Sequence, residues 1–307
     1  MTSKRQHIAD ENASLAEQPD APILAAVDGS ANSYQAVAWA AAEGALHHRR
    51  LHILTSVGIQ MGYGPGVLLT ETDTEWLRSE GERILTEATR LARTAAPGDD
   101  LAITTEVTFD LIIPTLIERS AHAHLLVVGS RGRGALQRGL LGSVSIAATH
   151  HAHCPVAVIH GIAALDPVSA TQPVLVGVDG TENSAPAIEL AFEQASHRKV
   201  DLIALHAWSD TSAVDLPMVN WETARGSAEA VLAESLAGWA ERYPDVKVHR
   251  IVVVDRPVRA LLDESANAQL VVVGCRGRGG FTSMVVGSTS NGLLHSVEVP
   301  MIVVRSN

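Results

Sequence analysis

The sequence predicts an α/β fold in which two tandem halves each form a parallel sheet with helices on both faces. Short aliphatic runs alternate with longer segments of helical periodicity, which is typical of strands joined by crossover helices. The composition agrees, because 46% of the 307 residues are hydrophobic but only 4% are aromatic, so the core is aliphatic. The strand–helix pattern also restarts in the second half, which indicates a tandem duplication.

Five apolar strands and the helices between them are predicted in the first half. The helix after the first strand is alanine-rich, with Asn32 or Ser33 as its cap. The next helix is long and amphipathic and ends at Pro97-Gly98, and Pro114 suits the first turn of the third. The predicted strands are Ile23–Val27, Leu51–Val57, Ala102–Val107, Leu125–Val128 and Val156–Ile159. The predicted helices are Ser33–His48, Glu71–Ala96, Pro114–Ala123 and Val144–His151, with a glycine-bearing loop at Gly58–Leu69.

The same succession is predicted in the second half. Its strands are Val174–Val178, Leu202–Ala207, Val246–Val254, Leu270–Val273 and Met301–Val304. Its helices are Ala185–His197, a long helix within Ala213–Tyr243, Pro257–Ala266 and a short helix before the last strand. Pro155 and Pro300 precede the last strand of each half, which suits edge strands that pair half to half or chain to chain.

These patterns predict four segments. Residues 1–21 are polar and predicted to be a disordered tail, and 161–172 are predicted to be a linker. The two domains are predicted at 22–160 and 173–307.

Composition narrows the classes of function. The net charge of −11 and the lack of a long basic run disfavour a general binder of nucleic acid or of a membrane surface. The N-terminal residues contain no apolar signal segment, and no run is long enough to span a bilayer. Cys154 and Cys275 occupy unmatched places in the two halves and are expected to be a buried thiol and a loop thiol, not a disulfide. We therefore expect a cytoplasmic protein.

A glycine-rich loop follows the fourth strand of each half. Gly129–Ser145 has the spacing G-x2-G-x9-G followed by serine, and Gly274–Ser290 repeats it. A strand, a glycine loop and a helix N-terminus together favour an anion site, because backbone N–H groups can approach phosphate oxygens there. Arg131, Arg133 and Arg138 add positive charge, although Arg138 could equally be a solvated side chain.

An aspartate follows the first strand of each half, in Asp28-Gly29-Ser30 and Asp179-Gly180-Thr181. In a doubly wound sheet, ligands bind beyond the carboxyl ends of the strands. If strands one and four are neighbours, each half brings a carboxylate for a ribose hydroxyl and an amide loop for phosphates to one crevice. The alternatives are that the aspartate only forms a turn and that the glycines only make a tight connection, but their joint recurrence favours a nucleotide site.

Other chemistries have weaker support. Neither loop is a Walker A motif, and lysine occurs only at positions 4, 199 and 247. The cluster of His150, His151 and His153, with His122 and His124 nearby in sequence, could be a metal site but has no counterpart in the second half. Positions on the surface or at a helix end account for these histidines better than a metal site does. No nucleophile motif is present.

These motifs resemble those of the universal stress protein family, and in particular its tandem-domain, ATP-binding members. The resemblance rests on G-x2-G-x9-G-[ST] after strand four and V-D-G-[ST] after strand one, and it covers both halves. It implies two tandem five-stranded parallel sheets of order 3-2-1-4-5, with helices on both faces, in the adenine nucleotide alpha hydrolase-like, Rossmann-like class. It also implies ATP as the ligand, alone or with Mg²⁺, and a homodimer.

The resemblance and the motifs together nominate one set of nucleotide contacts in each half. In the first half the candidates are Ala26, Asp28, Ser56, Gly129, Ser130, Arg131, Gly132, Arg133, Gly134, Gly142, Ser143, Val144 and Ser145. In the second half they are Gly177, Asp179, Ala207, Gly274, Cys275, Arg276, Gly277, Arg278, Gly279, Gly287, Ser288, Thr289 and Ser290. The glycine often found in the family at the start of helix three is replaced here by Asp110 and by Asp255 or Arg256, so the rim of each crevice is expected to differ from the family pattern.

Three functions follow from this pattern. The first is an ATP-binding regulatory module of the stress response, with one site in each domain. The second is a slow Mg²⁺-dependent ATPase or nucleotidyl transferase, against which the missing lysine and general base argue. The third is an interaction scaffold with degenerate nucleotide sites.

Overall fold

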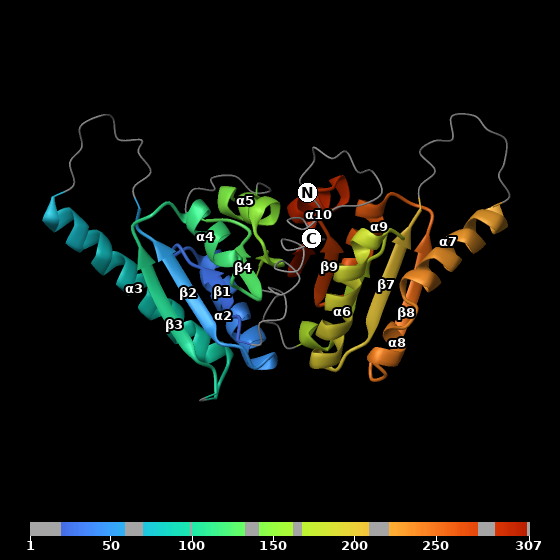
Figure 1. Ribbon diagram of the computed structural model, residues 1–307, viewed down its shortest axis with the longest axis horizontal. Coiled ribbons are helices and arrows are strands. Elements are labelled where there is room, and N and C mark those ends of the chain that lie inside the picture. Colours follow the sequence, from blue (N-terminus) through green and yellow to red (C-terminus); the bar gives the residue numbers. More distant parts are fainter. Residues whose placement is uncertain are drawn as a thin grey trace, which may run out of the picture. The chain divides into compact units, whose positions relative to one another are not determined.

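The computed structural model describes residues 20–58, 70–98, 100–132, 141–161, 168–208, 221–275 and 286–305, without the side chains of residues 221–224. The chain divides into two compact units, which we call unit 1, up to His160, and unit 2, from Gly161. Each unit is an α/β layer structure with a parallel sheet, as Figure 1 shows. The predicted N-terminal tail, apart from Asp20 and Ala21, and most of the Gly58–Leu69 loop lie outside the described residues.

Unit 1 has the predicted strand order 3-2-1-4-5, which reads β3-β2-β1-β4-β5. All its neighbouring strands are parallel, so their carboxyl ends share one edge. The strands are β1 Ile23–Ala26, β2 Leu51–Ser56, β3 Ile103–Thr108, β4 Leu125–Gly129 and β5 Val156–Ile159. The helices are α2 Ala31–Leu46, α3 Glu71–Ala95, α4 Ile112–Ser120 and α5 Ser143–His151. Helices α2 and α3 pack together on one face, and α4 and α5 pack together on the other.

Unit 2 repeats this order as β8-β7-β6-β9-β10, again with parallel neighbours. Its strands are β6 Val174–Gly177, β7 Leu202–Ala207, β8 Val248–Val253, β9 Leu270–Gly274 and β10 Met301–Val304. Its helices are α6 Ala185–Arg198, α7 Trp221–Ser235, α8 Trp239–Arg242, α9 Pro257–Ser265 and α10 Ser288–Ser296, with short 3-10 turns η2 Ser169–Thr171 and η3 Glu182–Ser184.

Several element boundaries differ from the predictions for local reasons. Helix α2 is capped by Ser30, whose side chain accepts from Ser33 N, and not by Asn32 or Ser33. The single long helix predicted before Tyr243 is two helices, because Gly238 adopts a left-handed conformation with φ of 81°. Part of the predicted linker is ordered as η2, and Gln269 Nε2 donates to Ala170 O over 2.9 Å.

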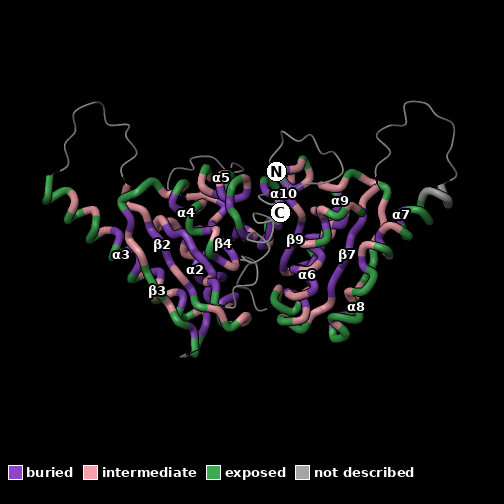
Figure 2. Tube along the Cα trace, viewed as in Figure 1, coloured by how far each residue is buried: buried purple, intermediate pink, exposed green. Residues whose placement is uncertain are grey.

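The core of each unit is aliphatic, as the composition predicted. Strand β4 and its equivalent β9 are buried along their length apart from the final glycine (Figure 2). Both cysteines are free and buried, and Cys275 lies directly after β9 at the start of the loop, where the loop thiol was expected. Burial raises the pKa of the Cys154 thiol to about 12, which makes it unreactive near neutral pH. Among the described residues, no helix combines the length and the apolar composition needed to cross a bilayer.

Candidate functional site

The carboxyl ends of β1 and β4 lie next to each other in unit 1. Ile23, Leu24 and Ala25 of β1 pair in parallel with Leu125, Leu126 and Val127 of β4. The turn that begins at Asp28 and the loop that begins at Gly129 therefore leave the same edge of the sheet. This neighbour relation is the condition under which the sequence predicted a shared crevice.

The Asp28 carboxylate is held by the turn that follows it. Its Oδ1 accepts from Ser30 N at 2.9 Å, and Asp28 N donates to Ser33 Oγ at 3.2 Å. Its Oδ2 faces the glycine loop, because a Cβ atom at Gly132 would lie only 2.5 Å from that oxygen. The alternative role of Asp28 as a turn residue is thus real, but the same side chain also lies against the predicted phosphate loop.

The loop after β4 is anchored at both ends. Ser130 N donates to Ile159 O of β5, and Gly142 N donates to Ser130 O, each at 2.8 Å. Gly142 has extended backbone angles and is the N-cap of α5, and no side chain caps that helix in the described part of the chain. The first N–H groups of α5 are therefore open to an anion, and the helix dipole favours one.

Two serines at the start of α5 differ in their environment. Ser145 is 2% exposed, and its hydroxyl donates to Gly129 O at 2.7 Å. This bond fastens the helix to the end of β4, so the hydroxyl hydrogen of this candidate nucleotide contact is already used within the protein. Ser143 is exposed, so its hydroxyl faces solvent at the mouth of the site.

Gly129 is required by close packing. A Cβ atom there would lie 2.9 Å from Asn32 O and 3.1 Å from Ser33 N, both backbone atoms at the start of α2. We expect Gly129→Ala to lower the free energy of unfolding by about 1–3 kcal/mol, because backbone cannot move aside as a side chain can. Urea denaturation measures this loss, and Gly161→Ala is the matched control because a Cβ at Gly161 meets nothing within 4 Å. Equal stability of the two variants would contradict the close approach.

Unit 2 repeats the local geometry. Asp179 Oδ1 accepts from Thr181 N and from Thr181 Oγ1, each at 2.8 Å. Gly287 N donates to Cys275 O at 2.6 Å, and the Ser290 hydroxyl donates to Gly274 O at 2.6 Å. The N-cap of α10, Gly287, has nearly the same backbone angles as Gly142, and no side-chain cap is found among the described residues.

A cavity of about 1240 Å³ opens at the sheet edge of unit 1. Every described candidate contact of this unit except Ser130 lines it. One end is formed by the glycine loop and the start of α5, with Arg131 as its cation, and Asp28 lies in the wall. The part of the lining that comes from β2 and α3, which we call the apolar end, is mostly apolar and contains Val57, Trp76, Leu77 and Ile84, together with Thr55, Ser56 and Glu80. Leu111–Pro114, at the start of α4 beside α5, add further apolar surface.

The apolar end of the cavity was missed by sequence reasoning. Trp76 is 67% exposed and comes from the first turns of α3, far in sequence from the strand ends. The predicted contact Ser56 lines this end, and its hydroxyl donates to Asp110 O at 2.7 Å, which ties the ends of β2 and β3 together. Only the three-dimensional topology shows that the start of α3 and the strand ends share one wall.

The remaining candidates have varied positions. Ala26 is buried at the end of β1, and its counterpart Gly177 lies where a Cβ would be 3.1 Å from Leu261 Cδ1 of α9. Ser130 is buried and does not line the cavity, Ala207 ends β7, and Thr289 lies in the first turn of α10. Arg133, Gly134, Arg138, Arg276, Gly277, Arg278 and Gly279 lie outside the described residues.

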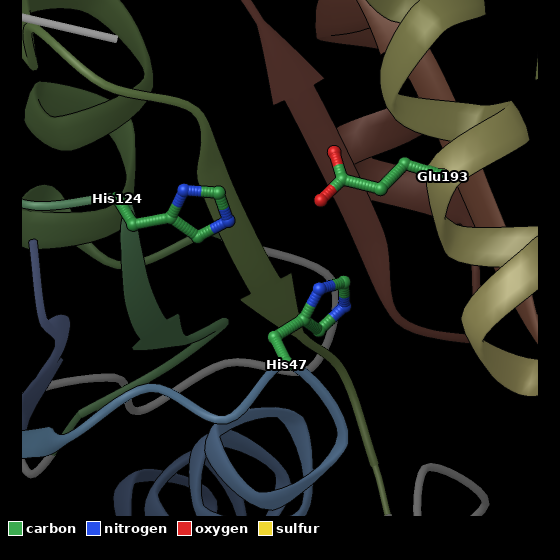
Figure 3. Close-up of side chains that lie close together, drawn as sticks. All are labelled: His47, His124 and Glu193. Atoms are coloured by element: carbon green, nitrogen blue, oxygen red, sulfur yellow. The ribbon is translucent and has the colours of Figure 1, made fainter. Parts of the chain in front are cut away.

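The histidines that the sequence singled out do not form a three-ligand group in the described part of the chain. His150 and His151 have ring centroids 6.0 Å apart, and His153 N donates to Ser120 Oγ. A different pair, His47 and His124, lies within unit 1 with ring centroids 6.1 Å apart (Figure 3). His47 also pairs with the buried Glu43 at 3.0 Å, a contact that the i, i+4 spacing on α2 could have indicated.

Comparison with known proteins identifies relatives over nearly the whole chain. The model of the Universal stress protein family matches residues 21–160 and again 170–305. Universal stress protein Rv2005c of Mycobacterium tuberculosis is 46% identical over 286 residues, which cover 93% of this chain and 97% of the relative. Universal stress protein Rv2623 of the same organism is 40% identical over 292 residues, which cover 93% of this chain and 96% of the relative.

Solved structures of low sequence identity share the fold. A universal stress protein from Archaeoglobus fulgidus superimposes with a TM-score of 0.66 at 20% identity, covering 94% of this chain and 97% of that one. A protein described as a universal stress protein from Pseudomonas aeruginosa gives a TM-score of 0.57 at 14% identity, with 95% of each chain covered.

Proposed function

The chain belongs to the universal stress protein family, and from this premise we propose that it binds one ATP molecule in each of its two units and acts as a nucleotide-dependent regulatory module. The observation that carries the proposal is the position of Asp28. Its carboxylate lies against the backbone of Gly132 in a cavity that also contains the open N-terminus of α5. A carboxylate that can accept a hydrogen bond from a ribose and a loop that can hold phosphates thus line the same cavity, as a single bound nucleotide requires.

The phosphate end is supported by backbone geometry. The first turn of α5 has no side-chain cap among the described residues, and the preceding loop reaches it through Gly142. Anionic oxygens satisfy such N–H groups and are favoured by the helix dipole. Arg131 adds a charge that can pair with phosphate.

The base end is supported by its apolar lining. A nucleobase is flat and mostly apolar on its faces, and Trp76, Leu77, Ile84 and Leu111 supply matching surface. Because the cavity is continuous from this end to α5, its polar and apolar ends follow the order of base, sugar and phosphate. We propose that unit 2 binds the same class of ligand through Asp179 and the start of α10.

The described residues that line the cavity favour binding of ATP without its hydrolysis. It contains no lysine, histidine or cysteine, so those general bases and nucleophiles do not face the cavity from the described residues. Its carboxylates are Asp28, in the turn with Ser30, and Glu80, whose two oxygens pair with Arg83 at 2.8 Å each. We therefore propose a binding module, not a phosphoryl-transfer enzyme.

Calorimetric titration with ATP and with adenosine tests the proposal. We expect adenosine to bind at least about 100-fold more weakly, because it forgoes several charge-assisted bonds of about 1.5–3 kcal/mol each at the helix N-termini. Triphosphate without a nucleoside should also bind weakly, because the base end remains empty. Similar affinity for ATP and adenosine would contradict a phosphate cradle, and no binding of either would contradict the proposed function.

The remaining expectations are part of the same proposal. We propose that the protein is a cytoplasmic homodimer that binds neither nucleic acid nor membranes, in keeping with its net charge of −11. Light scattering with and without ATP measures the oligomeric state, and a monomer under both conditions would contradict the dimer.

A further inference from the structure

Thr55, the fifth residue of β2, carries a buried hydroxyl that no described residue satisfies. Its side chain is 1% exposed, and Oγ1 has no hydrogen-bond partner among the described residues. The residue nevertheless lines the cavity of unit 1. A buried hydroxyl without a partner is costly, so a group that enters the cavity and completes the bond is favoured.

Three hydroxyl groups near Thr55 at this sheet edge are satisfied within the chain, whereas Ser130 Oγ, buried just after β4, also lacks a partner among the described residues but does not line the cavity. Ser33 Oγ donates to Ser30 O at 2.9 Å, and Ser56 Oγ donates to Asp110 O at 2.7 Å. Thr108 Oγ1 donates to Asp110 Oδ2 at 3.3 Å. Of the buried side-chain oxygens without a partner among the described residues, Thr55 Oγ1 is the one that belongs to the cavity lining.

Most side chains around Thr55 in the cavity wall are apolar, and the polar ones there are Ser56 and Glu80. Val57 follows it on the same side of the strand, and Leu77 and Ile84 line the same end from α3. This end lies across β1 from the glycine loop, so a nucleotide with its phosphates at α5 would bring its base here. The base edge is then the part of the ligand that can reach the hydroxyl.

The equivalent position in unit 2 is chemically different. The fifth residue of β7 is His206, which is also 1% exposed. Its Nδ1 lies 2.7 Å from Val178 O, at the end of β6 beside Asp179, so that nitrogen donates to the backbone. Unit 2 thus places an anchored imidazole where unit 1 places a small hydroxyl without a described partner.

We propose that the Thr55 hydroxyl reads the 6-substituent of a purine base in unit 1, and that the exchange of Thr55 for His206 makes the two units recognise the base differently. A threonine hydroxyl both accepts and donates, so it pairs with the amino group of adenine but finds no partner when the 6-substituent is hydrogen. This inference rests on the proposed nucleotide site.

The test is a thermodynamic cycle that combines the protein variant Thr55→Val with a change of the 6-substituent of the ligand. It uses the full chain with Asp179→Ala, so that calorimetry reports unit 1, and compares ATP with purine riboside triphosphate, which lacks the amino group. We expect Thr55→Val to weaken ATP about 5- to 30-fold and to leave the analogue within about 2-fold. Thr55→Ser retains the hydroxyl and should bind ATP like the parent.

A purely structural hydroxyl would behave otherwise. Thr55→Val keeps the shape and removes an unsatisfied group, so the unliganded variant should melt no lower than its parent. An unchanged affinity for ATP, or an equal loss for both ligands, overturns the role of Thr55 while the nucleotide site stands. Failure of the parent protein to bind either ligand overturns the proposed function instead.

The difference between Thr55 in unit 1 and His206 in unit 2 allows a second test, in which unit 2 receives the residue of unit 1. In a chain with Asp28→Ala, calorimetry reports unit 2, and His206→Thr should increase its preference for ATP over purine riboside triphosphate toward that of unit 1. An unchanged preference in this variant, with ATP still bound, contradicts the assigned difference between the units.

Discussion

Replacement of Asp28 by alanine is expected to weaken ATP binding in unit 1 by about 10- to 100-fold, as measured by calorimetry in a chain whose unit 2 site carries Asp179→Ala. The variant loses a hydrogen bond from a ribose hydroxyl to a charged acceptor, which is worth about 1.5–3 kcal/mol. The carboxylate is positioned for this bond by the turn in which Oδ1 accepts from Ser30 N.

Because that turn is also structural, a second variant separates the two roles of Asp28. Asp28→Asn can still accept from Ser30 N but has no negative charge, so it should keep the stability of the parent while binding ATP more weakly. The ligand supplies the complementary change, since 2′,3′-dideoxy-ATP lacks both ribose hydroxyls. We expect the losses from Asp28→Asn and from the dideoxy ligand not to add, because each removes the same bond.

Asp263→Ala is the control for the loss of one carboxylate. Asp263 lies on α9, its side chain is 74% exposed, and it lies 3.8 Å from Arg259. This variant should bind ATP like the parent. Additive losses in the Asp28 cycle, or an equal loss in the control, would contradict the contact between Asp28 and the sugar.

Replacement of Phe192 by alanine is expected to lower the free energy of unfolding of unit 2 by about 3–5 kcal/mol. Phe192 is fully buried on α6, and its ring centroid lies 6.0 Å from that of Trp239 and 5.7 Å from that of Tyr243. Truncation leaves a cavity and removes both ring contacts, which join α6 to the segment around α8.

Hydrogen exchange resolved by peptide measures this loss in each unit separately. Amides of β6, β7 and β9 should lose protection in Phe192→Ala, whereas those of β1, β2 and β4 should be unchanged, because the cited contacts lie within unit 2. Phe192→Leu keeps most of the volume and should cost less than about 1.5 kcal/mol. A loss spread equally over both units, or no loss, would contradict the assigned role of this cluster.

Sequence patterns predicted the central strands well because their residues are buried on both faces, whereas the outer strands β3 and β8 are partly exposed. Leu125–Val128 and Leu270–Val273 are continuous aliphatic runs, and both are strands within one residue of the predicted ends. Helix ends were less predictable. The cap at Ser30 and the break at Gly238 depend on which of several suitable residues adopts the required backbone angles, and local sequence does not decide that.

The candidate site was predictable where glycine and aspartate motifs recur, and less so elsewhere. The adjacency of Asp28 and Gly132 follows from motifs at the ends of neighbouring strands. The apolar end was not foreseen, because Trp76 and Ile84 are ordinary positions of an amphipathic helix until the topology brings them to the sheet edge. The role of Thr55 also depends on the lack of a partner in three dimensions, which sequence alone does not reveal.

Equilibrium dialysis against ATP tests the central claim most directly, because it counts the sites on each chain. We predict close to two ATP molecules per chain for the parent protein and close to one for Asp28→Ala and for Asp179→Ala, at concentrations that saturate only an intact site. Two molecules retained by both variants, or none bound by the parent protein, would contradict the account.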